Sequence, residues 1–100
     1  MNMKINEGEA VLIVLQNPRE KVWGILREVN QAGVFVRGID LNSFEDFVLS
    51  VIQKEPFYGL SEQFFPMWRI ERITMDDADG DIPSMQAQFE ERTGINFSDF

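Results

Sequence analysis

The spacing of hydrophobic positions predicts strands in the first part of the chain. Residues 9–16 form a β-branched apolar run of strand length. Residues 21–29 and 34–39 are typical of two further strands, joined by an Asn30–Gly33 turn with hairpin chemistry. Gly24 interrupts the earlier of these two strands, where a glycine marks a bend or a close approach between backbones. We therefore expect a bent antiparallel meander.

After Leu41 the spacing becomes helical. Apolar residues recur at i, i+3, i+4, i+7 and i+8, the pattern of a helix that buries one face, and they are Phe44, Phe47, Val48, Val51 and Ile52. Ser43 and Asp46 resemble a capping box at the start of this helix, and Pro56 stops it. A helix is therefore expected over residues 44–54, with its stripe against the core.

The second half of the chain predicts two more strands and a second helix. The strands cover residues 63–68 and 69–75, and Pro66 favours an edge position or a bulge. An acidic linker follows at residues 76–82, and a C-terminal helix and tail occupy residues 83–100. The docking face of this helix is expected to carry Ile82, Met85 and Phe89.

Length and patterning together predict a single domain that is mainly β with α. A small five-stranded barrel would span about residues 9–75, with one helix inserted between its third and fourth strands. The 44% hydrophobic and 12% aromatic contents suit a folded core.

Charge and composition narrow the classes of function. The chain carries nine Lys and Arg against seventeen Asp and Glu, a net charge of −8, which repels phosphate backbones. It has no histidine and no cysteine, so the commonest general base, thiolate metal sites and disulfides are excluded. We expect no enzyme activity and no cofactor. Any contact with nucleic acid would fall on the basic residues of the first half, which are Lys4, Arg19, Lys21, Arg27 and Arg37.

The acidic linker contains the nearest approach to a metal motif. Asp77, Asp79 and Asp81 have the opening spacing of a calcium loop. The match then fails, because Ile82 stands where the sharp turn needs glycine and Gln88 stands where a bidentate Glu is needed. We therefore expect a solvated linker and no metal.

The expected compartment is the cytoplasm, and no membrane partner is expected. The absence of cysteine suits a reducing compartment, and the first residues contain no apolar signal core. The longest apolar run, Ala10 to Leu15, is far too short to span a bilayer.

Five of the twelve aromatic residues gather between positions 57 and 68, and they are Phe57, Tyr58, Phe64, Phe65 and Trp68. Three interpretations stay open from the sequence: core packing, a protein-binding surface, or stacking of nucleic-acid bases with help from the following arginines. Our hypothesis is a contact surface for a protein partner, made of Phe57, Tyr58, Phe65, Trp68 and Arg69.

The chain resembles the Sm-like family over about residues 10–40 and 63–75. The first family motif corresponds to alternating apolar residues, then glycine and leucine, here Val11, Ile13, Leu15, Gly24 and Leu26. The second corresponds to the run from Phe64 to Ile73. The resemblance implies a strongly bent five-stranded barrel, although other SH3-like barrels fit these residues nearly as well.

The departures from the family pattern fall on its RNA-binding positions. Asn30 stands where the family has an acidic residue, and Val34 stands at its base-cupping asparagine. Pro66 and Met67 replace its Arg-Gly pair. The family forms rings by pairing the fourth strand with a neighbour's fifth, and Pro66 removes one donor from that edge.

These observations predict a non-catalytic protein-interaction or scaffold module whose partner is another protein or a second copy of itself, in a homo-oligomer. The alternative is an Sm-like RNA-binding protein, which the net charge of −8 and the missing motif residues disfavour.

Overall fold

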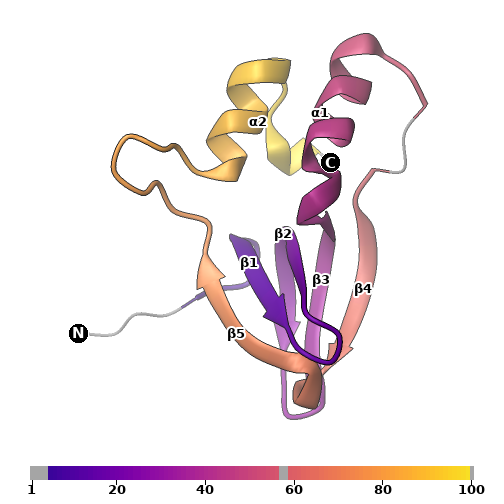
Figure 1. Ribbon diagram of the computed structural model, residues 1–100, viewed down its shortest axis with the longest axis vertical. Helices are drawn as coiled ribbons and strands as arrows, with labels where there is room; N and C mark the ends of the chain where they lie inside the picture. The colour runs from indigo at the N-terminus through magenta and orange to yellow at the C-terminus, as the bar shows by residue number, and fades with distance from the viewer. Residues whose placement is uncertain (1–4, 57–58, 100) are drawn as a thin grey trace.

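A computed structural model describes residues 5–56 and 59–99 of the chain (Figure 1). These residues contain five strands, two α-helices and three short 3-10 turns. In chain order the elements are β1 (Ala10–Leu15), β2 (Glu20–Val29), β3 (Gly33–Asp40), η1 (Leu41–Ser43), α1 (Phe44–Gln53), β4 (Ser61–Pro66), η2 (Met67–Arg69), β5 (Ile70–Met75), α2 (Met85–Thr93) and η3 (Phe97–Asp99).

The strands form one antiparallel sheet in the order β4-β3-β2-β1-β5. The expected meander, the helix between the third and fourth strands and the C-terminal helix are all confirmed. Pro66 ends β4, and β4 lies at an edge of the sheet, as expected. The sheet curls but does not close, because β4 and β5 do not pair with each other and form its two edges. The closed barrel is therefore not confirmed, and the fold is a mixed α/β fold with an open five-stranded sheet.

Two glycines face each other where the backbones of β2 and β3 approach closely. Gly24 of β2 pairs with Gly38 of β3. A Cβ atom added at Gly24 would lie 2.6 Å from the Cα of Gly38, and one added at Gly38 would lie 2.6 Å from the carbonyl oxygen of Trp23. Both distances are below any ordinary contact, so only glycine permits this approach. The expectation of a close backbone approach at Gly24 is confirmed.

The two faces of the sheet support separate hydrophobic clusters. The inner, concave face holds Val11, Ile13, Leu15, Val22, Leu26, Val34 and Val36, with Phe65, Ile70 and Ile73 packed against them. The outer face is covered by the two helices at one end of the sheet, opposite the β2–β3 turn (Figure 1). Its cluster contains Trp23, Phe44, Phe47, Val48, Val51, Leu60, Phe89 and Phe97.

The first helix begins as expected but is capped differently. Ser43 is the N-cap residue, yet its side chain makes no capping hydrogen bond, so the capping box is wrong. Asp40 instead accepts a hydrogen bond from the amide of Asn42 at the start of η1. Four residues of the expected stripe are buried, whereas Ile52 is 46% exposed, so its place in the core was predicted wrongly. Among the described residues, no helix is both long and apolar enough to cross a membrane.

The second helix is positioned by an aspartate that precedes it by nine residues. Asp76 accepts hydrogen bonds from the amides of Met85 and Gln86, and also from the indole N–H of Trp23. The helix then buries Phe89 against the Trp23 cluster. Ile82 is 63% exposed, so its expected docking role is wrong.

The tail after α2 returns to the same core. Phe97 is buried and stacks on the Trp23 ring, with 4.3 Å between ring centroids. Its amide donates to the Glu90 carboxylate, which holds the tail beside α2. Arg92 of α2 donates to the Glu45 carboxylate of α1, at 2.6 and 3.0 Å. Phe97 is therefore part of the hydrophobic core.

Candidate functional site

Two exposed phenylalanines lie side by side on the part of the outer face that the helices leave uncovered. Phe35 of β3 pairs with Phe64 of β4, and their ring centroids are 4.8 Å apart. The rings are 40% and 43% exposed. Alternation along each strand explains this position, because the neighbours Val34, Val36 and Phe65 point to the inner cluster. We call Phe35 and Phe64 the phenylalanine pair.

An ion cluster flanks the phenylalanine pair. Arg27 of β2 donates to the Glu62 carboxylate of β4 at 2.9 Å, and Arg37 of β3 approaches the same carboxylate at 3.4 Å. The hydrogen bond from Arg27, with a smaller effect from Arg37, lowers the pKa of Glu62. The same hydrogen bond raises the pKa of Arg27. The cluster therefore stays charged and fixes three long side chains beside the edge strand.

The edge of β4 presents backbone groups that lack a partner among the described residues. Met67 donates its amide to the carbonyl of Ala32. Because alternate residues of an antiparallel strand turn their N–H and C=O groups toward the neighbour, this bond shows which residues of β4 face β3. By that alternation residues 61, 63 and 65 bond to β3, while Glu62, Phe64 and Pro66 turn their backbone groups outward. Pro66 has no N–H, so its side of the edge offers a carbonyl only. The open edge is thus short, with two outward amides.

The turn after β4 continues the apolar surface. In η2, Met67 is 42% exposed and Trp68 is 65% exposed. Arg69, by contrast, is engaged in hydrogen bonds and an ion pair within the chain. Its guanidinium donates to the carbonyls of Gln16 and Pro18 and to the Glu20 carboxylate, at 2.7, 2.9 and 2.7 Å. Arg69 therefore fastens the β1–β2 turn to η2.

The residues of the predicted contact surface are spread over different environments. Phe57 and Tyr58 lie outside the described residues. Phe65 is half-buried and packs against the inner cluster, whereas Trp68 is exposed. Sequence reasoning missed Phe35 and chose Phe65 over Phe64. Period-two alternation could have separated the last two, but nothing in the sequence states which face of β4 points inward.

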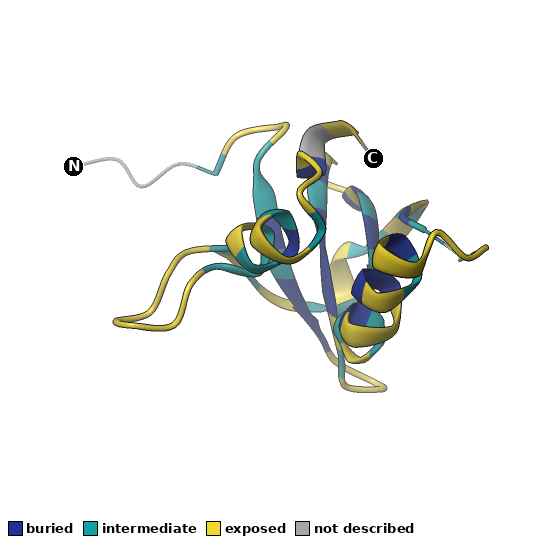
Figure 2. Ribbon diagram, turned by 90° about the horizontal axis from the view of Figure 1, so that it is seen from above, coloured by how far each residue is buried: buried dark blue, intermediate teal, exposed yellow. Residues whose placement is uncertain are grey.

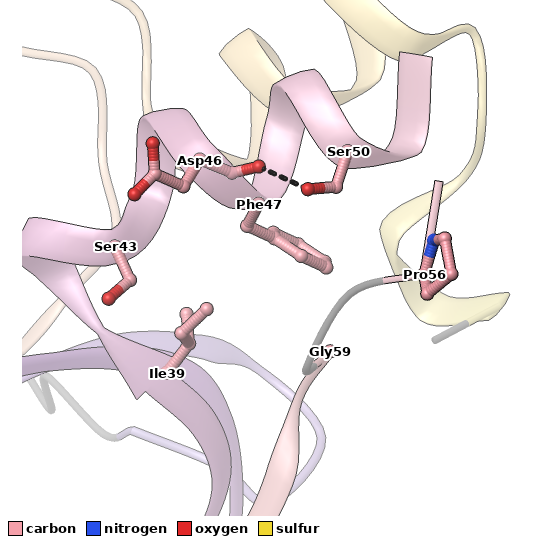
Figure 3. Close-up of a pocket in the computed structure, with 7 residues that line it drawn as sticks. All are labelled: Ile39, Ser43, Asp46, Phe47, Ser50, Pro56 and Gly59. Atoms are coloured by element: carbon pink, nitrogen blue, oxygen red, sulfur yellow. Dashed lines mark hydrogen bonds between the residues drawn. The ribbon is translucent and has the colours of Figure 1, made fainter. Parts of the chain in front are cut away.

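The pocket shown in Figure 3 lies between α1 and the end of β3. It has a volume of about 240 Å³, and Ile39 and Phe47 form its apolar wall. That volume is smaller than a typical pocket for a small molecule. The Ser50 hydroxyl donates to the backbone carbonyl of Asp46 at 2.8 Å, so it is held by the helix itself.

The acidic linker projects away from the body of the molecule in both views (Figures 1 and 2). Asp77, Asp79 and Asp81 are exposed along it. Residues 79 and 82 form an isolated bridge that turns the loop back on itself. No group of three metal-ligating side chains occurs among the described residues. Asp76, at the base of the loop, accepts hydrogen bonds from Trp23 and from the first turn of α2 instead.

All six arginines of the chain form ion pairs. Beyond the three already described beside β4 and η2, Arg19 and Arg72 lie near Glu71, and Arg92 binds Glu45. The six arginines thus pair with four carboxylates of the same chain, those of Glu20, Glu45, Glu62 and Glu71.

Comparison of the chain with known protein families, with curated proteins and with solved structures finds no match in any of the three. The Sm-like resemblance thus stays a prediction, and the site has to be interpreted from its own geometry.

Proposed function

We propose that this chain is a non-catalytic interaction module that associates with itself, on a scaffold of the SH3-like or Sm-like kind. The observation that carries the proposal is the exposed phenylalanine pair beside a strand edge that is paired on one side only. Open edges and clustered exposed aromatics are both features that proteins either protect or use for binding.

The strand order and the glycine contact support the barrel-type scaffold. The resemblance implies five strands with a helix between the third and fourth, and the sheet has this order of elements, with β5 paired to β1. The close Gly24–Gly38 approach lies in the hairpin that carries the resemblance, beside the inner core cluster. A second chain that adds a strand to an edge of this sheet would extend the same scaffold.

The chemistry of the described pocket supports a non-catalytic role. The sequence lacks histidine and cysteine, which leaves few groups able to transfer a proton near neutral pH. The Ser50 hydroxyl donates to the backbone carbonyl of Asp46, so its proton is held by a group that is not a general base.

The pairing of the arginines favours a protein partner over RNA. A phosphate backbone would have to compete with Glu62 for Arg27 and Arg37, and with Glu20 for Arg69. The net charge of −8 adds repulsion at long range. RNA binding is therefore the weaker of the two hypotheses.

Light scattering coupled to gel filtration, from micromolar to millimolar protein, tests the proposal. We expect the mass to rise with concentration, and we expect Phe64→Ser to suppress that rise. Leu49→Ser is the matched control, because Leu49 is equally exposed, at 43%, but lies on α1. A chain that stays monomeric at every concentration contradicts the proposal. A labelled single-stranded RNA that binds at low salt and dissociates as salt increases would favour the alternative.

A further inference from the structure

We propose that two copies of this chain pair their β4 edges antiparallel, around a two-fold axis that passes between the two Phe64 residues. This inference rests on the self-association proposed above and specifies its geometry. It differs from the ring arrangement that the Sm-like resemblance implies, in which β4 meets a neighbour's β5.

The outward backbone groups of β4 suit a two-fold pairing. With the axis at Phe64, each Phe64 amide donates to the Phe64 carbonyl of the second copy. Two residues away, each Glu62 amide meets the Pro66 carbonyl of the second copy. These four hydrogen bonds use Pro66 only as an acceptor. The pairing is thus compatible with the one position on this edge that has no N–H.

The side chains on the outer face favour the same register. The axis places Phe64 directly opposite Phe64 of the second copy, where cross-strand neighbours are in contact. Each ring already lies against its own Phe35, so four rings would form one cluster across the axis. A shift by one pairing position would instead set Phe64 against Glu62, whose carboxylate is engaged by Arg27 and Arg37.

The charge around β4 favours a second copy as the occupant. The chain as a whole carries −8, so two copies repel each other over most of their surface. Beside the phenylalanine pair, however, Arg27 and Arg37 balance Glu28 and Glu62, and the local net charge is zero. A second copy can therefore approach this face without the like-charge penalty that it meets elsewhere.

The other open edge is less suitable for pairing. On β5 the carbonyl of Met75 already accepts a hydrogen bond from the amide of Asp77, at 3.0 Å. The strand then runs into the loop that carries the exposed carboxylates of Asp77, Asp79 and Asp81. A second acidic chain would meet these charges at the β5 edge, which favours β4 pairing with β4.

Concentration-dependent amide hydrogen exchange, followed by NMR on the unmodified chain, tests this geometry. Pairing of β4 edges slows exchange at Glu62 and Phe64 as the concentration rises, while the outward amides of β5, at Ile73 and Met75, exchange as before. Slowing at both edges overturns the proposal in favour of β4–β5 pairing. Association that slows neither edge overturns it as well, while the proposed function survives. If the chain does not associate at any concentration, both the β4 pairing and the proposed function are overturned.

Two substitutions of Phe64 separate the contribution of its backbone amide to dimerisation from that of its ring. Phe64→Ala removes the ring and keeps the outward amide, whereas Phe64→Pro removes both. The intramolecular ladder does not use that amide, so proline is compatible with the fold. We expect Phe64→Pro to dimerise about tenfold more weakly than Phe64→Ala, because two symmetric hydrogen bonds are lost. Equal dimerisation of the two variants, with folding verified by circular dichroism, overturns the proposal.

Discussion

Asp76 is the residue whose removal tests the architecture most directly. Its carboxylate receives three hydrogen bonds, from Trp23 Nε1 at 3.1 Å and from the amides of Met85 and Gln86 at 2.8 Å each. It therefore joins the end of β5 to the buried tryptophan of β2 and to the first turn of α2. Asp76→Ala removes all three bonds without altering the backbone.

The expected loss follows from the two roles of the side chain. Loss of a capping side chain costs about 1 kcal/mol. A buried N–H that loses a charged acceptor costs roughly 1–3 kcal/mol, and the Trp23 indole is fully buried. Together we expect Asp76→Ala to lower the free energy of unfolding by about 2–4 kcal/mol. Asp76→Asn keeps one carbonyl acceptor and should fall between the wild type and the alanine variant.

Urea unfolding followed by tryptophan fluorescence measures this loss. A Trp68→Phe background leaves Trp23 as the sole reporter, because Trp68 is the exposed tryptophan. Asp77→Ala is the control, since Asp77 is exposed and should change stability by less than about 0.5 kcal/mol. If Asp76→Ala and Asp77→Ala have equal effects, the bridging role of Asp76 is refuted.

Three further predictions concern the core, the bend and the ion pairs. Phe97→Ala should cost about 3–5 kcal/mol in urea unfolding, because a fully buried ring is lost, and a cost like that of the partly exposed Ile95→Ala would contradict the packing. Gly24→Ala should cost about 1–3 kcal/mol, because its Cβ meets the β3 backbone; an unchanged midpoint would argue against the close approach. The pKa values of Glu45 and Glu62 are lowered by the hydrogen bonds from Arg92 and Arg27, so the contribution of these two ion pairs to stability is fully present above the ordinary value of 4.5 and is lost as the pH falls through the lowered values. Replacing both glutamates by glutamine should flatten the urea midpoint against pH in that range, and an unaltered profile would show that the pairs do not contribute.

Much of the fold follows from local sequence pattern. The apolar run of β1, the Asn30–Gly33 hairpin and the helical spacing of α1 each depend on residues close together in the chain, so they could be predicted from periodicity and turn chemistry. The bend at Gly24 was also predictable, because a glycine inside a strand usually marks a bend or a close backbone approach. Pro66 indicated an edge strand, because proline has no N–H to donate to a neighbouring strand and is therefore found at sheet edges.

Apart from the capping box at Ser43, the failures discussed next concern contacts between residues far apart in the sequence. The helical spacing placed Ile52 in the core, but α1 covers one end of the sheet and leaves that side chain 46% exposed. The local pattern assigned Asp76 to a solvated linker, because the sequence does not reveal that Trp23 and the start of α2 converge on its carboxylate.

The candidate site divides in the same way. The sequence alone determined that aromatic residues gather near β4, that the chain is strongly acidic and that histidine and cysteine are absent. Tertiary structure decided which phenylalanine faces solvent, that Arg69 is engaged within the chain and that β4 lies at an open edge. The physical reason is that alternate side chains of a strand point to opposite faces, so a strand can bury either one set or the other. The partner strands and helices that cover one face decide which set is buried, and the strand's own residues do not.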